Sequence, residues 1–482
     1  MQLTARSAMF LAFTAITQRF ATAINPGMKL AFLFGFFVAA SPLSASSGPA
    51  PNIVVIISDD AGFNEFSIHG STLFKTPRID SIARDGVHFT NGYTSGAVCS
   101  PTRAGLLTGR YQNRFGHEFN IPPVYSETNG LSLEETTLPE VLAAHNYQTI
   151  ALGKWHLGYA PQFHPLSRGF SDYYGFLQGA RSYFPLEKPT ILNRLLHNRE
   201  PIPETFDYMT DELGRTAAKY IADRGEKPFF MYLAFNATHG PNHATEADLK
   251  TVKGGGGNQT HRAMTVALDR AVGMVLDELE QQKIADNTLV FFINDNGGVF
   301  SHDNTPLRGF KGSTWEGGIR VPFAMRWPKA FSGGKVVDAP VISLDIFPTV
   351  LAAAGVTTSP GKPLDGVNLL PVANGTQTDR PHETLYWKNG SKWAVRHGDL
   401  KLVAGNTASK NSKKKKLKNQ PQKGVVNSGV ATSSEHQPAP QLFNLATDPA
   451  ETNDLAGTHP EVVTQLHGMY EQWKKDFPPK SW

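Results

Sequence analysis

The sequence predicts an α/β protein with a smaller, differently patterned C-terminal part, and two observations carry this prediction. Continuous apolar runs rich in β-branched residues, such as 52–58 and 288–293, are typical of strands buried on both faces of a parallel sheet. Segments with a helical spacing of apolar residues lie between such runs, at 138–145, 209–224 and 263–283. Strands that alternate with helices indicate a layered α/β domain.

The N-terminal region has the pattern of an export signal. Met28-Lys29 precedes a short apolar run at 30–40, and small residues follow at 41–45. The run is too short for a comfortable transmembrane helix, so we expect no stable membrane anchor. We therefore interpret residues 1–46 as an export signal region and expect a periplasmic or secreted protein. Met28 is the start of translation that we favour, and a long presequence from Met1 is the alternative.

Four apolar runs end in polar residues. The residues that follow these runs are Asp59-Asp60, Gly153-Lys154-Trp155-His156, Asn236-Ala237-Thr238-His239 and Asn294-Asp295-Asn296. In open α/β sheets ligands bind at the carboxyl ends of the strands, so we expect these groups to lie near one another. The oxygen-bearing groups among them indicate a hard divalent cation, and they are Asp59, Asp60, Asp295 and Asn296. A solvated turn is the alternative for any single one of these strand ends.

Cys99 is the only cysteine of the chain, so it has no disulfide partner within it. Pro101 and Arg103 follow it, and Gly109 is a plausible end for a helix that starts at Cys99. A helix N-terminus favours an anion, and Arg103 would add positive charge beside it. The pattern predicts a reactive side chain at position 99. A buried cysteine that acts as a small hydrophobic residue is the alternative.

The pattern Cys-x-Pro-Thr-Arg followed by Leu-Leu-Thr-Gly-Arg at 99–110 closely resembles a signature of the type I sulfatases. A second signature of that family is similar to Gly153-Lys154-Trp155-His156-Leu157-Gly158. The resemblance runs from about residue 52 to the C-terminus, apart from one insertion. It implies an alkaline-phosphatase-like fold, a large mixed sheet flanked by helices with a smaller C-terminal α+β subdomain built on an antiparallel sheet.

The resemblance also implies a chemistry for position 99. In that family a maturation enzyme, either formylglycine-generating or anaerobic, oxidises the cysteine to formylglycine, and one hydroxyl of the hydrated aldehyde attacks sulfur. Arg103 and Lys154 would hold this group. His239 would protonate the leaving oxygen with help from Lys311, and His156 would deprotonate the second hydroxyl. His243 is a weaker competitor for the role of His239.

The implied metal ligands are Asp59, Asp60, Cys99, Asp295 and Asn296, and the implied substrate contacts are Lys154, His239 and Lys311. The resemblance favours Ca²⁺, and composition alone leaves Mg²⁺ open. Aromatic residues gather at 169–184, where they either pack in the core or line the mouth of the pocket.

The C-terminal part has a different pattern. Residues 383–403 and 441–445 predict short strands with polar alternation, and 460–476 predicts a terminal helix. We expect a catalytic domain at 47–378 and a C-terminal subdomain at 379–482. A lysine-rich stretch at 405–440 interrupts this subdomain and has the composition of a disordered loop. A role in attracting polyanionic substrate is the alternative for this stretch.

The sequence therefore predicts an enzyme that hydrolyses sulfate esters, on a sulfated carbohydrate or polysaccharide. The formal net charge of +4 resides largely in one lysine run, so it does not indicate nucleic-acid binding. Two alternatives stay open. One is a phosphodiester or phosphonate monoester hydrolase of the same superfamily, and the other is a non-enzymatic, metal-dependent polysaccharide-binding protein.

Overall fold

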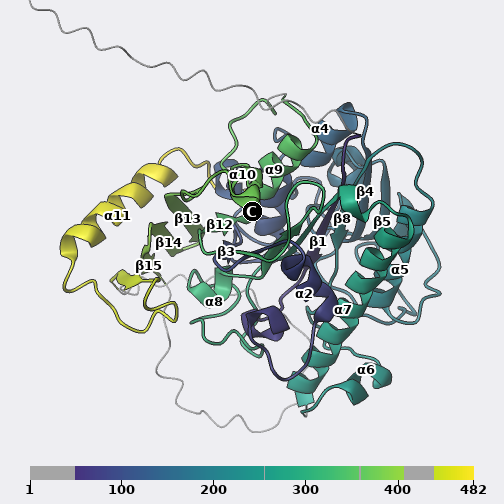
Figure 1. Ribbon diagram of the computed structural model, residues 1–482, viewed down its shortest axis with the longest axis horizontal. Coiled ribbons are helices and arrows are strands. Elements are labelled where there is room, and N and C mark those ends of the chain that lie inside the picture. Colours follow the sequence, from purple (N-terminus) through teal and green to yellow (C-terminus); the bar gives the residue numbers. More distant parts are fainter. Residues whose placement is uncertain (1–48, 255, 358–359, 406–438) are drawn as a thin grey trace, which may run out of the picture. The chain divides into compact units, whose positions relative to one another are not determined.

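The computed structural model describes residues 49–254, 256–357, 360–405 and 439–482. Within these residues the strands form a ten-stranded, a two-stranded and a four-stranded sheet (Figure 1). The predicted export signal at 1–46 and most of the lysine-rich stretch, 406–438, lie outside the described residues. Among the helices of the described part, none is long and apolar enough to cross a membrane.

The ten-stranded sheet has the order β11-β2-β10-β9-β1-β8-β4-β5-β6-β7. Its strands are β1 (Asn52–Ser58), β2 (Val87–Phe89), β4 (Gln148–Lys154), β5 (Asp172–Phe176), β6 (Leu196–His197), β7 (Glu200–Pro201), β8 (Phe229–Ala234), β9 (Thr288–Asn294), β10 (Phe323–Arg326) and β11 (Lys335–Val337). The strands from β9 to β5 run parallel, whereas β10 is antiparallel to β9. The sheet is mixed, which confirms the predicted fold class.

The remaining strands belong to the two smaller sheets. They are β3 (Gly92–Tyr93) with β12 (Val341–Ile342), and β13 (Thr384–Asn389), β14 (Lys392–His397), β15 (Leu400–Ala404) and β16 (Gln441–Asn444). The helices are α2 (Pro77–Arg84), α3 (Cys99–Thr108), α4 (Leu138–Ala144), α5 (Met209–Ala222), α6 (Glu246–Thr251), α7 (Gly256–Gln281), α8 (Glu316–Ile319), α9 (Ile346–Ala353), α10 (Leu370–Asn374) and α11 (Pro460–Lys474).

The large sheet is buried on both faces because alternate residues of each central strand point to opposite sides. In β1, Ile53 and Val55 join the core that contains α3, α4 and α9. Val54 and Ile56 join the opposite core, which contains α5 and α7. Helices α5 and α7 lie side by side over that face (Figure 1). This explains why the central strands are continuous apolar runs in the sequence.

Helix α3 is buried along its whole length. It begins at Cys99, and Gly109 ends it in the left-handed conformation with φ 66°, where its N–H donates to the carbonyl oxygen of Gly105. A Cβ at position 109 would lie 2.9 Å from the side chain of Phe347, so only glycine fits there without a shift. The helix from Cys99 to Thr108 therefore agrees with the prediction.

Helix α7 begins several residues earlier than predicted, at Gly256 instead of near Ala263. Its first turns are polar in sequence and so lack the apolar spacing that predicts a helix. In the fold His261 is nevertheless buried, and its Nε2 lies 2.8 Å from Oδ1 of Asn242. The first turns of this helix therefore make polar contacts with another segment, and the spacing of apolar residues in the sequence does not reveal such contacts.

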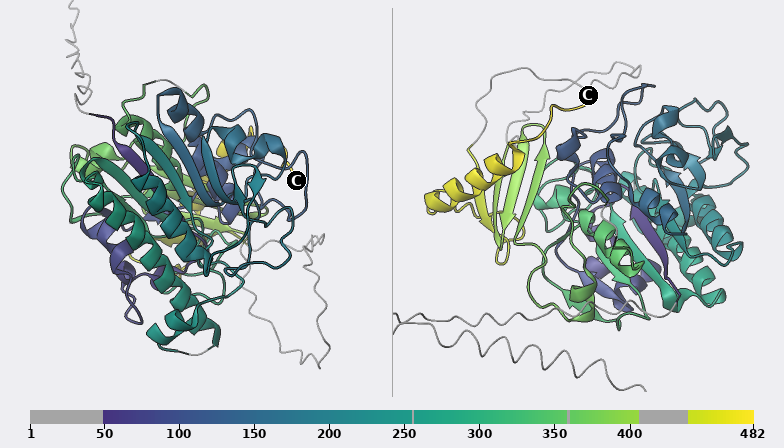
Figure 2. Two further views of the ribbon diagram at one scale, coloured as in Figure 1. Left: turned by 90° about the vertical axis from the view of Figure 1, so that its right-hand side faces the viewer. Right: turned by 90° about the horizontal axis from the view of Figure 1, so that it is seen from above.

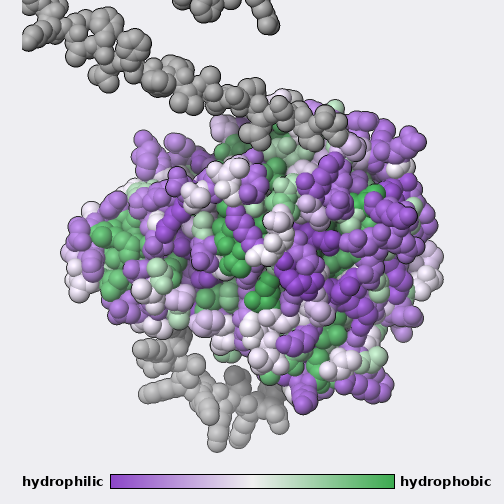
Figure 3. Space-filling view, viewed as in Figure 1, coloured by the Kyte–Doolittle hydropathy of each residue, from purple (hydrophilic) through white to green (hydrophobic). Residues whose placement is uncertain are grey.

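The four-stranded sheet β13-β14-β15-β16 is antiparallel. Helix α11 covers one of its faces (Figure 2), where the ring of Trp393 stacks on Tyr470 with centroids 4.2 Å apart. The other face packs on the rest of the protein, and Trp387 Nε1 donates to the carbonyl oxygen of Thr94. On the face of the molecule shown in Figure 3, hydrophilic residues cover more area than hydrophobic ones.

Candidate active site and metal centre

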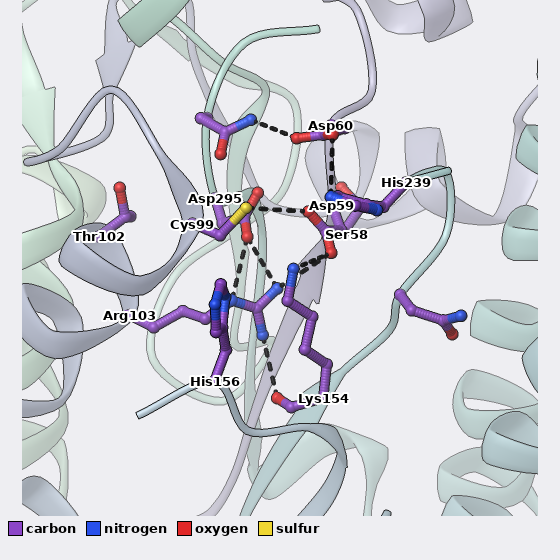
Figure 4. Close-up of polar contacts among 12 residues, drawn as sticks. Ser58, Asp59, Asp60, Cys99, Thr102, Arg103, Lys154, His156, His239 and Asp295 are labelled. Carbon is purple, nitrogen blue, oxygen red and sulfur yellow. Dashed lines mark hydrogen bonds and ion pairs between the residues drawn. The ribbon is translucent and has the colours of Figure 1, made fainter. Parts of the chain in front are cut away.

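The carboxyl ends of four neighbouring parallel strands meet at one edge of the large sheet. Because β9, β1, β8 and β4 are adjacent, the polar residues that follow each strand converge there. Figure 4 shows Asp59, Asp295, Lys154 and His239 gathered around Cys99 at the start of α3. The strand-end residues of the sequence analysis are therefore brought together.

Asp59 lies at the centre of this cluster and is fully buried. Its Oδ2 accepts from Lys154 Nζ at 2.5 Å, and its Oδ1 lies 3.6 Å from Cys99 Sγ. Burial acts to raise the pKa of Asp59, but Lys154 and the other nearby cations outweigh it and hold the pKa well below its usual range. Asp59 is an anion held among cations.

Asp60 faces a second cation and an amide. Its Oδ1 lies 2.6 Å from Lys311 Nζ and accepts from Asn296 Nδ2 at 2.7 Å. Burial acts to raise the pKa of this carboxyl, but Lys311 together with His239 and Lys154 outweighs it, so the pKa is lowered. Lys311 Nζ also lies 3.0 Å from Cys99 Sγ, which joins the loop after β9 to the start of α3.

Arg103 binds Asp295 through two donors. Its Nε and Nη2 donate to Oδ2 of Asp295 at 3.0 and 2.8 Å, and its Nη1 donates to the carbonyl oxygen of Lys154. Both side chains are buried. Burial, followed by the neighbouring charge of Asp59, raises the pKa of Asp295.

Two oxygen atoms of this cluster fit a cation. Oδ1 of Asp295 and Oδ1 of Asn296 are buried and have no hydrogen-bond partner within the described residues. Polar atoms in such positions are expensive to leave unpaired. Ligand atoms of Asp59, Asp60, Cys99 and His239 all lie within 4.8 Å of one another. Carboxylate and amide oxygens suit Ca²⁺ or Mg²⁺, so the donor set fits a hard divalent cation.

The two histidines of the site differ in exposure. The side chain of His239 is 24% exposed, its Nε2 lies 3.5 Å from Asp60 Oδ2, and its Nδ1 lies 2.6 Å from the carbonyl oxygen of Gly240. His156 is buried, and burial followed by Lys154 lowers its pKa well below the ordinary value. His156 is therefore neutral near pH 7. His243 instead faces Ser182, with its Nδ1 3.4 Å from Oγ.

Burial also changes the pKa of the Cys99 thiol. Its side chain has no exposed surface, and burial followed by the charge of Asp295 raises the pKa of the thiol to about 12. The thiol is therefore protonated at neutral pH, and a protonated thiol is a poor nucleophile.

Several positioning residues were not assigned from the sequence. Ser58 and Asn294 are register partners at the ends of β1 and β9, and Ser58 Oγ donates to Asn294 Oδ1 at 2.7 Å. Their places as the last residues of two strands were visible, but the pairing of the strands was not. Tyr183, in the aromatic stretch 169–184, is buried, and its hydroxyl donates to the carbonyl oxygens of Asn236 and His239.

A second polar cluster supports the turn after Asp60. Glu65 Oε2 accepts from the N–H of Gly62 at 2.8 Å and lies 2.9 Å from His302 Nδ1. His302 Nε2 in turn lies 3.1 Å from His261 Nε2. A Cβ at position 62 would come within 2.4 Å of the carbonyl oxygen of Asp303. The cluster thus fixes the close approach of two loops on which the site depends.

The chain matches two family descriptions and several known proteins. A family model described as Sulfatase matches residues 51–356, and one described as the C-terminal region of aryl-sulfatase matches residues 380–481. The N-acetylgalactosamine-6-sulfatase of Canis lupus familiaris is 31% identical over 475 residues, which cover 92% of this chain and 89% of the relative. The human enzyme of the same name is also 31% identical, over 91% of this chain and 88% of its own length.

A solved structure is similar over most of the chain. The crystal structure of Ps i-CgsB in complex with k-i-k-neocarrahexaose has a TM-score of 0.78 and 33% sequence identity. The similarity covers 90% of this chain and 94% of that one.

Proposed function

The chain belongs to the sulfatase family, and we propose that it removes sulfate from a sulfated carbohydrate with a formylglycine made from Cys99 and a bound divalent cation. The convergence of buried carboxylates, cations and Cys99 at one sheet edge supports this proposal most strongly. A sulfated oligosaccharide or polysaccharide is the substrate class that we favour. One relative, 31% identical, is named N-acetylgalactosamine-6-sulfatase. A solved structure, 33% identical, is a complex with k-i-k-neocarrahexaose.

The proposed cation is Ca²⁺ in preference to Mg²⁺. Its ligands would be oxygen atoms of Asp59, Asp60, Asp295 and Asn296, together with position 99. The unpaired buried oxygens of Asp295 and Asn296 support this set, and the site is rich in the anionic oxygens that Ca²⁺ prefers. A cation bound there would supply positive charge to polarise the sulfate ester.

Formylglycine at position 99 would supply, once hydrated, two hydroxyl groups on one carbon, one as the nucleophile and one whose deprotonation releases sulfate. Arg103 and Lys154 surround this position and would orient it. Lys311 Nζ, 3.0 Å from Cys99 Sγ, would hold a sulfate oxygen where charge shifts during the reaction. The buried setting strengthens each of these contacts, because water is excluded.

The two histidines would divide the proton transfers. His239 is the more exposed, so its Nε2 would face the leaving oxygen of the substrate and donate a proton to it. His156 is buried and neutral, so it would take the proton from the second hydroxyl at position 99.

The test is a substrate panel given to protein in which mass spectrometry shows an aldehyde at residue 99. We expect turnover of 4-nitrophenyl sulfate and sulfate release from sulfated galactose or galactosamine oligosaccharides. Faster turnover of an aryl phosphodiester or phosphonate monoester would favour the phosphoester alternative. Sugar binding without any turnover would favour the non-enzymatic one.

The proposal includes a maturation partner and a location. A formylglycine-generating or anaerobic maturation enzyme would act on Cys99, and the export pattern around Met28 would direct the chain to the periplasm or the medium. Sequencing the N-terminus of protein recovered outside the cytoplasm tests the location, and we expect it between about residues 40 and 51.

A further inference from the structure

Two phenylalanines in the segment that carries Lys311 are exposed to solvent. Phe300 is 84% exposed and Phe310 is 44% exposed. Their rings meet edge to face with centroids 5.6 Å apart, so they form one aromatic shelf. Single exposed apolar residues are common on protein surfaces, but two exposed rings in contact that line one pocket indicate a binding role.

The shelf is joined to the active site by the chain itself. Phe310 directly precedes Lys311, whose Nζ lies 3.0 Å from Cys99 Sγ. Phe300 and Phe310 both line a pocket of about 470 Å³, with Arg308, Trp315 and Lys392 also in its wall. This volume lies within the range of about 300–1,000 Å³ found for small-molecule sites. The pocket wall therefore includes the residue that directly precedes Lys311 in the chain.

The charge of the pocket suits an anionic ligand. The guanidinium of Arg308 lies 3.7 Å from the ring centroid of Trp315, which holds it in the pocket wall. Lys392 Nζ donates to the carbonyl oxygen of Gly312, so the C-terminal sheet contributes a second cation. Asp303 also lines the pocket, but its carboxylate already accepts from Asn64 and Thr305.

We propose that the aromatic shelf binds a second sugar unit of a sulfated chain, next to the unit that loses its sulfate; this inference rests on the proposed function. A flat ring face packs well against the apolar C–H face of a sugar, while Arg308 and Lys392 attract the sulfate groups that such a chain carries. The site therefore selects oligosaccharides and polysaccharides over monosaccharides.

The test measures binding to the Cys99→Ala protein, in which we expect no turnover of the bound ligand. The probes are a sulfated tetrasaccharide that the matured enzyme hydrolyses and the sulfated monosaccharide from the same polymer. In the Phe300→Ala/Phe310→Ala background we expect the Kd of the tetrasaccharide, measured by calorimetry, to rise about tenfold, as for the loss of one or two ring contacts. The Kd of the monosaccharide should change less than about twofold.

The matched control is Val336→Ala, because Val336 is also apolar and 62% exposed but lies on edge strand β11. It should change neither Kd. A Lys392→Gln variant should weaken the salt dependence of tetrasaccharide binding. An unchanged tetrasaccharide Kd in the phenylalanine variant, or an equal rise for both ligands, would overturn the inference. Failure of the matured wild type to hydrolyse any sulfate ester would instead overturn the proposed function.

Discussion

Asp60 and His156 both adopt the left-handed backbone conformation, with φ of 62° and 59°. This conformation is uncommon for residues other than glycine, and it concentrates at functional sites where surrounding contacts impose it. Each residue lies just beyond a strand, and the turn directs its side chain toward Cys99 (Figure 4). At the scale of the residue, the site is built by strand ends that turn sharply.

The first prediction concerns Cys99. Serine at this position can accept a sulfuryl group but has no second hydroxyl on the same carbon, so Cys99→Ser should react at most once and accumulate sulfated protein. Cys99→Ala should be inert. Intact-protein mass spectrometry after incubation with substrate distinguishes these outcomes. Full activity in a preparation whose residue 99 is entirely free thiol would contradict the formylglycine mechanism.

The second prediction concerns Arg103. Lysine keeps the charge but cannot donate to Asp295 through two nitrogens and to the Lys154 carbonyl with a third. Arg103→Lys should therefore lower kcat about 10²–10³-fold, the loss typical of a displaced electrostatic group. Arg168→Lys is the control, because Arg168 is equally buried but binds backbone carbonyls elsewhere. If the two variants lost activity equally, Arg103 would have no special role.

At the scale of the element, the sequence predicted those strands whose own residues form a recognisable apolar pattern. The strands β1, β8 and β9 were visible because burial on both faces makes them apolar throughout. Their polar ends were visible because the apolar run stops there, although Asp59, Asp60 and Asp295 are themselves buried. The short strands β2, β3, β11 and β12 were not predicted, because two or three residues carry no period and their pairing is set by distant segments.

In the site, too, some residues could be predicted from local sequence patterns and others could not. Asp59, Asp60, Asp295 and Cys99 could be grouped from strand ends and the family signature, whereas Glu65 and Tyr183 support them through contacts between loops. The exposure of Phe300 could not be predicted either. A single phenylalanine in a loop belongs to no periodic pattern that would indicate whether its side chain is buried.

The third prediction concerns the histidine that links helix α9 to the C-terminal part. His382 Nε2 lies 2.7 Å from Asp345 Oδ1, and Asp345 also accepts from the N–H groups of Ile342 and Val367. Burial acts to lower the pKa of His382, but Asp345 outweighs it and raises the pKa. The stabilisation is therefore complete below the unfolded-state value of about 6.5 and is lost as pH rises through the higher folded-state pKa.

His382→Gln should accordingly lower the free energy of unfolding by about 1–3 kcal/mol at acidic pH and by less at alkaline pH. Urea denaturation at the two pH values measures the difference. His467→Gln is the control, because the side chain of His467 is half exposed and its ion pair with Glu471 should matter little at either pH. A loss that grew with pH would contradict the predicted sign.

At the scale of the whole molecule, a buried ion network joins the C-terminal sheet to the loop that carries Lys311. Lys401 of β15 has no exposed side-chain surface and lies 2.7 Å from Glu316 Oε1 and 3.0 Å from Glu451 Oε1. Glu451 also accepts from the N–H of Glu316 at 2.7 Å. Three segments distant in sequence therefore share one lysine.

The fourth prediction is that Lys401→Met destabilises the protein by about 3–5 kcal/mol, because it leaves two buried carboxylates without their cation. Denaturant unfolding measures this loss. Adding Glu316→Gln and Glu451→Gln to the same chain should recover part of it, since the uncompensated charge is then removed. No recovery in the triple variant would show that packing, and not charge, sets the cost.

The fifth prediction concerns the cation. Chelation should lower both activity and Tm, and Ca²⁺ at about 100 times its Kd should stabilise the protein by about 2.7 kcal/mol through mass action. Asp59→Ala should reduce the bound metal measured by atomic emission. Full activity in metal-stripped protein would contradict the proposed ligand set.

The complete burial of α3 has a consequence for the order of folding and of the proposed oxidation of Cys99. The proposed maturation enzyme would have to reach Cys99, yet this side chain and the rest of its helix are buried in the folded protein. Under the proposed mechanism, oxidation would therefore have to precede folding. A chain that folded first would keep its thiol, and it would have to unfold around α3 before it could mature.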